Sequence, residues 1–339
     1  MRIAQVMAGA PAGGAELFFE RLCIALHQAG ETVLPVIRTE PARAARLREA
    51  GLAPESLAFG GPLDIVTRPR LARLLRGFAP DVAVSWMSRA TWHMPRGKFV
   101  HVARLGGYYP LKYYRRADHL VGNTEGIVAW LRANGWPAER THYLPNFVTD
   151  FAATAPAEEF ARGEPMLLAL GRLHRDKAFD VLIRALALVP RARLVIAGAG
   201  PEGEALAAIA REEGVAGRVH LIGWRQDVGA LLKAADLFVC SSRVEPLGNV
   251  VLEAWSAGCA VVAADADGPR ELIRPGIDGL VCPREDAVAL AEAIRTVLGD
   301  ITLARRLAAA GRARFAAEFA AAPVLAQWRR FLGDVAARR

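Results

Sequence analysis

The 339-residue sequence has few cysteines and no long apolar run. Its four cysteines, Cys23, Cys240, Cys259 and Cys282, form no C-x-x-C pair and mostly lie in apolar stretches. This argues against a zinc site or a disulfide framework and predicts reduced thiols packed inside a cytoplasmic protein. No apolar stretch is long enough to span a bilayer, and the apolar run at the N-terminus is too short for a signal peptide. We therefore expect no membrane-spanning helix.

Residues that would hold a metal or form a nucleophilic triad are also scarce. The seven histidines fall in no arrangement with a serine and an acid that indicates a hydrolase triad. The triplet 265–267, Asp-Ala-Asp, resembles the D-x-D of metal-dependent sugar transferases, but such triplets are common by chance, and no other acidic cluster accompanies it. We therefore expect neither a metal nor another cofactor.

Positive charge is concentrated in the first half of the chain. The formal net charge is +8, from 43 Lys and Arg against 35 Asp and Glu. Residues 1–150 hold 19 basic and 12 acidic residues, which leaves 24 and 23 for the remainder. A basic N-terminal surface would suit an acidic acceptor or an anionic membrane. Nucleic acid is not expected as a partner, because no nucleic-acid-binding motif accompanies the charge.

Strand-like and helix-like segments alternate along the chain. The first half has apolar strand-like segments at 2–7, 32–38, 81–86, 98–104 and 119–123, and Thr124 is expected to cap the helix that follows. The second half has such segments at 166–171, 192–198, 218–223, 237–240 and 260–265. Apolar strands that alternate with helices are typical of α/β proteins with a parallel, doubly wound sheet.

This alternation is interrupted once, at residues 149–165, which lose the periodicity and collect Pro, Ala and acidic residues. We expect a linker there. Because the chain is too long for one typical core, we predict two Rossmann-like domains, at 1–148 and 166–320. A last helix, about 321–337, lies beyond what the second sheet needs, and we expect it to pack back on the first domain.

The segment 240–258, CSSRVEPLGNVVLEAWSAG, combines a strand end, a Gly/Pro loop, a helix start and two glutamates. The helix should begin near Asn249 and end at Gly258. A helix that begins at the carboxyl end of a strand offers unpaired N–H groups to a phosphate, and Val250 and Val251 would supply them here.

Glu245 and Glu253 would repel a phosphate, so they are expected to accept hydrogen bonds from hydroxyls, as in a nucleotide sugar. Taken alone, each is better explained as an ordinary exposed acid. The segment 171–185 changes this balance, because it places Arg172 and Lys177 at the carboxyl end of a strand, just before a helix. Open α/β sheets bind ligands at that position, and two cations suit a diphosphate.

The segment GAGPEG (198–203) follows a strand and matches the dinucleotide-binding pattern G-x-G-x-x-G. The match is weak, because Pro201 occupies the loop and the next strand ends in Ile222-Gly223 without the acid that would hold a ribose. A nicotinamide or flavin cofactor is therefore not expected.

Six segments, in this order, carry a resemblance to a known family: GGAE (13–16), LPNFV (144–148), GRLHRDK (171–177), AGAGPEGEAL (197–206), EPLGNVVLE (245–253) and GPRELI (268–273). The chain resembles the retaining nucleotide-sugar glycosyltransferases of family 4, which have the GT-B fold. The spacing Glu, seven residues, Glu is typical of that family. The resemblance covers nearly the whole chain and implies two Rossmann-like domains with the active site in the cleft between them.

The resemblance also implies roles for single residues. Arg172 and Lys177 would neutralise the donor diphosphate, Glu245 would contact the donor sugar, and Glu253 would bind the ribose. The other donor-binding residues that it implies are Gly13, Gly14, Asn146, Gly171, Gly198, Gly200, Arg225, Gln226, Leu247, Gly248, Asn249 and Val250. Such chemistry needs no metal, because cations and helix amides stabilise the leaving diphosphate. The acceptor hydroxyl would attack from the face that the diphosphate leaves, so the anomeric configuration is retained.

The chain departs from the family at two places. The family usually has Gly after the lysine of its phosphate motif, where this chain has Ala178, and we expect a helix start to tolerate alanine there. Many members also place a His at the end of a strand in the first domain, next to the donor sugar. Here the stretch reads KFVHVARLGGYY. That role would fall to His101, inside the strand, to Arg104, nearer its carboxyl end, or to neither, and Arg104 is the preferred candidate.

The segment 104–116, RLGGYYPLKYYRR, holds four of the five tyrosines and several basic residues. Such a mixture suits a glycan acceptor or an anionic lipid surface, and the alternative is that the tyrosines simply pack in the interior. Together with the basic first domain, it favours a lipid-linked acceptor. We therefore expect a role in bacterial cell-surface glycan synthesis, such as that of lipopolysaccharide, with peripheral contact at the inner face of the cytoplasmic membrane.

Two other functions fit the same donor residues. A non-hydrolysing sugar-nucleotide epimerase shares the fold and acts on the donor without an acceptor. It would need catalytic acids in both domains, and the first domain shows none clearly placed. A non-catalytic nucleotide-sugar binding protein would also keep the donor site.

Overall fold

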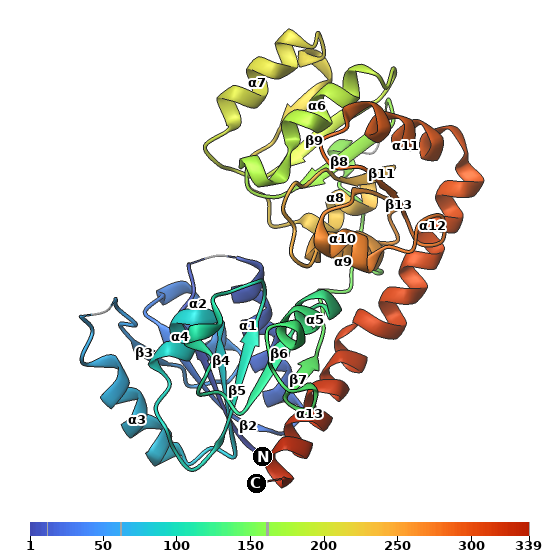
Figure 1. The fold of residues 1–339 in the computed structure, drawn as a ribbon. Helices are drawn as coiled ribbons and strands as arrows, with labels where there is room; N and C mark the ends of the chain where they lie inside the picture. Colours follow the sequence, from blue (N-terminus) through green and yellow to red (C-terminus); the bar gives the residue numbers. More distant parts are fainter. Residues whose placement is uncertain (12, 62, 161–162, 339) are drawn as a thin grey trace. The chain divides into compact units, whose positions relative to one another are not determined.

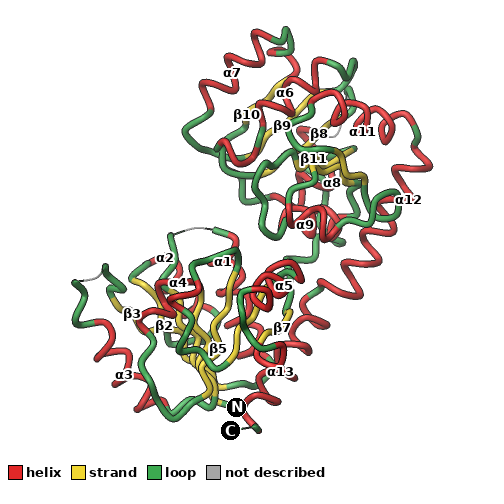
Figure 2. Tube along the Cα trace, in the orientation of Figure 1, coloured by secondary structure: helices red, strands yellow, loops and turns green. Residues whose placement is uncertain are grey.

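The computed structural model describes residues 1–11, 13–61, 63–160 and 163–338. The chain divides into two compact units: unit 1 is Met1–Phe147 with Ala321–Arg339, and unit 2 is Val148–Ala320. Each unit is built around a parallel sheet with helices on the outside (Figures 1 and 2).

Unit 1 has a seven-stranded sheet in the order β3-β2-β1-β4-β5-β6-β7. Its strands are β1 (Arg2–Met7), β2 (Thr32–Arg38), β3 (Glu55–Leu57), β4 (Val82–Trp86), β5 (Val100–Leu105), β6 (His119–Gly122) and β7 (Thr141–Tyr143). Its α-helices are α1 (Gly14–Gln28), α2 (Pro41–Glu49), α3 (Thr67–Phe78), α4 (Met87–His93), α5 (Glu125–Ala133) and α13 (Ala321–Ala337). Along β1, Ile3 and Met7 enter one apolar cluster and Ala4 and Val6 another, so both faces of the sheet are buried.

Unit 2 has a six-stranded sheet in the order β10-β9-β8-β11-β12-β13. Its strands are β8 (Met166–Leu170), β9 (Arg193–Ala197), β10 (Val219–Leu221), β11 (Leu237–Cys240), β12 (Val261–Ala264) and β13 (Leu280–Cys282). Its α-helices are α6 (Phe179–Ala187), α7 (Gly203–Glu212), α8 (Val228–Ala234), α9 (Asn249–Ala257), α10 (Asp267–Leu272), α11 (Ala287–Gly299) and α12 (Ile301–Arg314). Leu167 and Leu168 of β8 lie in different apolar clusters, so this sheet too is covered on both faces.

The α/β class and the parallel, doubly wound sheets are as the sequence predicts, and Thr124 caps α5 by accepting a hydrogen bond from the Ile127 N–H (3.1 Å). The strands and α-helices that the sequence analysis missed are β3, β7, β13, α4 and α10. The three strands have three residues each, α4 has seven and α10 has six, which is too few for a periodic pattern to show.

The predicted linker, 149–165, is not a free connector over its described residues. Asp150 forms an ion pair with Arg312 (2.7 Å) of α12, and Ala157 donates a hydrogen bond to the Ala230 carbonyl (3.0 Å) of α8. These contacts make the segment part of unit 2. Positions 161–162 of the predicted linker lie outside the described residues.

Helix α13 packs back on unit 1, as predicted. Trp328 stacks on Trp86, with 6.5 Å between ring centroids, and Arg329 pairs with Glu31 (3.0 Å). All four cysteines are buried free thiols. Within the described residues, no helix is both long and apolar enough to cross a membrane.

Candidate functional site

The topological switch point of unit 2 lies between β8 and β11, at the centre of its sheet. From β8 the chain continues to β9 and β10 on one side, whereas from β11 it continues to β12 and β13 on the other. The loops that follow β8 and β11 therefore both begin at the carboxyl ends of these strands and run in opposite directions. Open α/β sheets bind ligands at this position. The predicted basic segment follows β8, and the predicted acidic loop follows β11.

Lys177 and Glu245 meet at this switch point. The Lys177 ammonium forms an ion pair with Glu245 Oε2, and both side chains are half-buried. Burial is the largest single effect and lowers the pKa of Lys177, but the charge and hydrogen bond of Glu245, together with Cys240 and Asp176, outweigh it, so the pKa of the ammonium is raised. An ammonium can donate to several partners and a carboxylate can accept from several. Both groups therefore keep hydrogen-bonding capacity for a ligand.

The loop that carries Glu245 leads into α9. Gly248 is the N-cap residue with a φ of 84°, in the left-handed region that glycine enters without strain. Its N–H donates to Glu245 Oε1 (3.3 Å), and the Gly268 N–H donates to the Glu245 carbonyl (2.8 Å). The helix ends at Gly258, as predicted. The Gly248 N–H thus holds the Glu245 carboxylate, and the Gly268 N–H holds the Glu245 backbone.

The first turn of α9 differs from the prediction at one position. The Val251 N–H donates to the Gly248 carbonyl (2.9 Å), so the prediction that it is available to a phosphate is wrong. Asn249 and Val250 occupy the start of the helix and are half-buried. Glu253 follows Asn249 by four residues, which places the two on one face of the helix.

The loop after β8 packs tightly against the loop after β9. A Cβ atom at Gly198 would overlap the Gly171 carbonyl, and one at Gly200 would overlap the Leu173 carbonyl. Glycine at these two positions therefore allows the two loops to pass close to each other. This packing explains the G-x-G pattern without a bound dinucleotide. Arg172 lies in the first of these loops, is exposed and forms no ion pair with any described residue.

Arg225 and Gln226, two of the donor-binding residues that the resemblance implies, lie in the loop after β10. The Arg225 guanidinium is already paired with Asp227 (2.6 Å) and Glu159 (2.9 Å). Gln226 and its neighbour Trp224 are exposed. Arg225 would have to leave its two partners to reach a base, whereas Gln226 and the Trp224 ring are accessible as they stand.

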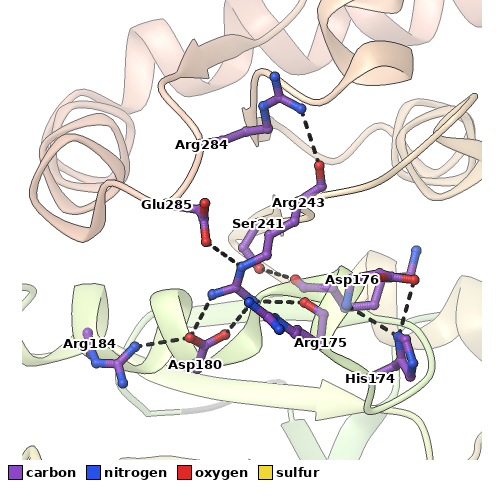
Figure 3. A network of polar contacts seen from close by, with 10 residues as sticks. His174, Arg175, Asp176, Asp180, Arg184, Ser241, Arg243, Arg284 and Glu285 are labelled. Carbon is purple, nitrogen blue, oxygen red and sulfur yellow. Dashed lines mark hydrogen bonds and ion pairs between the residues drawn. The ribbon is translucent and has the colours of Figure 1, made fainter.

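Arg243, in the loop after β11, holds together a network that the sequence analysis did not single out (Figure 3). Its guanidinium donates to both carboxylate oxygens of Asp180 (2.9 and 2.8 Å) and to the Arg175 carbonyl (2.8 Å). Its Nε donates to Glu285 (2.6 Å). A forked arginine–carboxylate contact of this kind fixes orientation as well as distance.

The same network joins the Lys177 turn to the Glu245 loop. The backbone N–H of Arg243 donates to the Asp176 carbonyl (2.8 Å), and the Ser241 hydroxyl donates to the Lys177 carbonyl (2.8 Å). The two residues of the central ion pair are thus held by their backbones as well as by each other. Sequence could not reveal this, because Arg243 and Asp180 are 63 residues apart.

In unit 1, Gly13 and Gly14 lie where the loop after β1 enters α1, and β1 borders the switch point between β1 and β4. This loop is held from both sides at Ala10. The Ala10 N–H donates to Glu16 Oε1 (2.9 Å), and its carbonyl accepts from Arg43 Nη2 (2.7 Å). Both charged residues are buried, and the sequence analysis had assigned neither of them a role.

Arg104 is the second-last residue of β5 and is fully buried. Its Nη2 donates to Asn146 Oδ1 (2.6 Å), and the guanidinium lies over the rings of Trp86 (4.8 Å) and Phe18 (5.4 Å). Its Nε and Nη1 have no hydrogen-bond partner in the described structure. Burial lowers the pKa of Arg104 to about 10, so it is charged at neutral pH. Its unused donors suit an oxygen-rich ligand.

His101 lies deeper in β5, as expected. Its ring Nε2 shares a hydrogen bond with the Ser85 hydroxyl (2.8 Å), and its backbone N–H donates to the Asp118 carboxylate (2.8 Å). Burial lowers the pKa of His101 to about 4, so the ring is neutral at pH 7. These contacts are those of a core histidine, and the geometry favours Arg104 over His101.

Ala178 has a φ of 51°, which is left-handed backbone. The expectation that a helix start tolerates alanine overlooked this conformation, which costs a residue with a Cβ about 1–2 kcal/mol. Glycine would avoid this cost, which explains why the family usually has glycine at this position.

The described residues contain no group of three or more His, Cys, Asp or Glu that could hold a metal ion. Of the D-x-D triplet, Asp265 pairs with Arg284 (3.2 Å) and Asp267 with Arg270 (3.5 Å).

Two doubly wound parallel sheets, each with a switch point, are the architecture of the GT-B fold. The structure of Anabaena Alr3699/HepE in complex with UDP shares this fold, with a TM-score of 0.86, 21% sequence identity, and coverage of 98% of this chain and 100% of that chain. This likeness establishes the fold class.

The family follows from sequence comparison. The family "Glycosyl transferases group 1" matches residues 150–314, and "Glycosyltransferase Family 4" matches residues 12–150. The lipopolysaccharide core biosynthesis glycosyltransferase LpsE of Rhizobium meliloti (strain 1021) is 35% identical over 320 residues, 91% of this chain and 92% of that protein. LpsD of the same strain is 35% identical over 311 residues, 88% of this chain and 89% of that protein. The chain belongs to the family-4 glycosyltransferases.

Proposed function

We propose that this glycosyltransferase moves a sugar from a nucleotide-diphosphate sugar to a hydroxyl of a glycan or glycolipid, with retention of anomeric configuration. The observation that carries the proposal is the Lys177–Glu245 pair at the β8/β11 switch point, with Arg172, which forms no ion pair with a described residue, in the same loop region. The relatives LpsE and LpsD are lipopolysaccharide core biosynthesis glycosyltransferases, which supports lipopolysaccharide or another bacterial cell-surface glycan as the product.

In the proposed reaction, the bond between the anomeric carbon and the diphosphate oxygen breaks while the acceptor oxygen bonds to that carbon on the same face. The acceptor proton passes to the leaving phosphate oxygen. Lys177, Arg172 and the first amides of α9 would stabilise the charge that develops on the diphosphate, without a metal. Glu245 would accept hydrogen bonds from the donor sugar and Glu253 from the ribose.

The donor can be identified by a thermal-shift screen of UDP-, GDP- and ADP-sugars on the full chain. A ligand at a hundred times its Kd stabilises the folded state by about 2.7 kcal/mol, so we expect one base to raise the Tm by roughly 5–10 °C. The shift should survive EDTA if binding needs no metal. A screen in which no nucleotide sugar raises the Tm would contradict the proposal.

An epimerase is less well supported, because it needs a catalytic acid in unit 1. The buried acid beside the glycine loop, Glu16, is already used to hold Ala10. Turnover that requires an added acceptor would distinguish a transferase from an epimerase or a binding protein. We further propose a cytoplasmic location, with peripheral contact at an anionic membrane where a lipid-linked acceptor is presented.

Arg243→Lys tests whether the network around the site positions its catalytic pair. We expect kcat to fall roughly ten- to a hundredfold with little change in Tm, because lysine cannot make the forked contact with Asp180 and the Glu245 loop would shift. Arg184→Ala is the matched control, since Arg184 contacts Asp180 (3.0 Å) without touching that loop. Equal losses of activity in the two variants would show that Arg243 does not position Glu245.

A further inference from the structure

The tyrosines of segment 104–116, predicted to suit a membrane surface or a glycan acceptor, divide between the interior and the surface of unit 1. Tyr114 is fully buried and its hydroxyl shares a hydrogen bond with Ser88 (3.2 Å). The Tyr108 ring packs edge-on against Trp130, 5.5 Å away. Interior packing therefore holds for Tyr114, whereas Tyr108 is 46% exposed beside Trp130.

Helix α3 of unit 1 carries positive charge only. It holds Arg68, Arg70, Arg73 and Arg76 and no acidic residue. All four arginines are exposed, and none forms an ion pair with any residue that the structure describes. Leu71 and Leu75 point into the core, so the arginines occupy the rest of the helix surface. We call this the basic face of α3, and Figure 1 shows α3 at the periphery of unit 1.

Large apolar side chains lie immediately before this helix. Leu63, Ile65 and Val66 are 94%, 82% and 56% exposed. Asp64 fixes the loop by accepting from the N–H groups of Gly60 (2.7 Å), Val66 (3.1 Å) and Thr67 (2.9 Å). The apolar side chains therefore lie exposed on either side of Asp64, which is itself held by these hydrogen bonds. We call Leu63, Ile65 and Val66 the apolar loop.

A tryptophan lies near the same loop. Trp92 at the end of α4 is 41% exposed, and its ring packs against His93 (4.6 Å). His93 in turn shares a hydrogen bond with the Gly60 carbonyl (3.3 Å), which ties the end of α4 to the start of the loop. Tryptophan prefers the boundary between lipid tails and water.

We propose that the apolar loop and the basic face of α3 bind the surface of an anionic lipid bilayer. The aliphatic side chains enter the boundary between headgroups and acyl chains, and the arginines meet lipid phosphates. A second copy of the chain fits this surface poorly, because a twofold contact would bring unpaired arginines against each other. The inference refines the membrane contact of the proposed function by naming its surface, but the binding itself can be measured without any glycosyl transfer.

Co-sedimentation of the full chain with vesicles tests this surface. We expect binding to phosphatidylglycerol-containing vesicles at low salt, and little binding to pure phosphatidylcholine. Arg70→Gln/Arg73→Gln should weaken partitioning about thirtyfold, since each basic side chain near the surface contributes about 1 kcal/mol. Leu63→Ser/Ile65→Ser should also weaken it, in low and high salt alike, because apolar insertion is not screened.

Two charge-matched controls locate the surface. Arg305→Gln/Arg306→Gln changes exposed arginines of α12 in unit 2, and Arg115→Gln/Arg116→Gln changes segment 104–116; neither should alter binding by more than about threefold. The proposal is overturned if no vesicles are bound, if the segment 104–116 variant loses binding instead, or if heparin or RNA binds where vesicles do not. The nucleotide-sugar thermal shift should persist in every variant, so loss of lipid binding is distinguishable from failure of the proposed function.

Discussion

Glu245→Gln should lower kcat by about 10²- to 10³-fold, the range seen when one preorganised group that stabilises a transition state is lost. The amide keeps the size of the side chain but removes the negative charge that pairs with Lys177 and would meet the reacting sugar. Because the two side chains are only 22% and 13% exposed, the loss of one partner should lower the free energy of unfolding by about 1–3 kcal/mol. Steady-state kinetics and calorimetry on the same preparation would measure both effects.

The control for this variant is Glu204→Gln, the same change at an exposed acid of α7. It should leave kcat within about twofold of the parent, as expected for a surface change away from the site. Binding of the nucleoside diphosphate should persist in Glu245→Gln, since its cationic partners remain. Near-normal turnover in Glu245→Gln would refute the assignment of Glu245 to the sugar.

Lys177→Met should lower kcat by about 10³-fold and also weaken binding of the nucleoside diphosphate, because a fixed cation at the leaving group acts both in the bound state and in the transition state. The methionine preserves the length of the side chain. Titration calorimetry with the diphosphate and single-turnover rates would separate the two effects. Unchanged diphosphate affinity would argue that Lys177 serves only to hold Glu245.

A double-mutant cycle decides between these roles for the pair. If Lys177 acts on the diphosphate and Glu245 on the sugar, the Lys177→Met/Glu245→Gln variant should lose clearly more activity than either single variant. If each residue only holds the other, removing the second one should cost nothing further. Lys177→Arg is a useful third variant, since it keeps the charge but changes the geometry of its donors.

Local sequence patterns predicted much of the fold. Apolar strands alternating with helices indicated two doubly wound sheets, since a strand covered on both faces must be apolar along its length. The start of α9 near Asn249, its end at Gly258 and the cap at Thr124 were equally visible, because these signals depend on neighbouring residues. The cost of the alanine at position 178 was misjudged, because the residue type alone does not show that its backbone is left-handed.

The candidate site was predictable only in its parts. The sequence by itself determined which loops carry cations and which carry carboxylates, because these residues follow the end of a recognisable strand. Only the tertiary structure decided that Lys177 and Glu245 form a pair, that Arg243 ties their loops together and that Arg104 is buried with unused donors. It also placed exposed arginines and apolar side chains side by side at α3, while burying Tyr114. The physical reason is that ion pairs and burial depend on strand order, which brings together residues far apart in the chain.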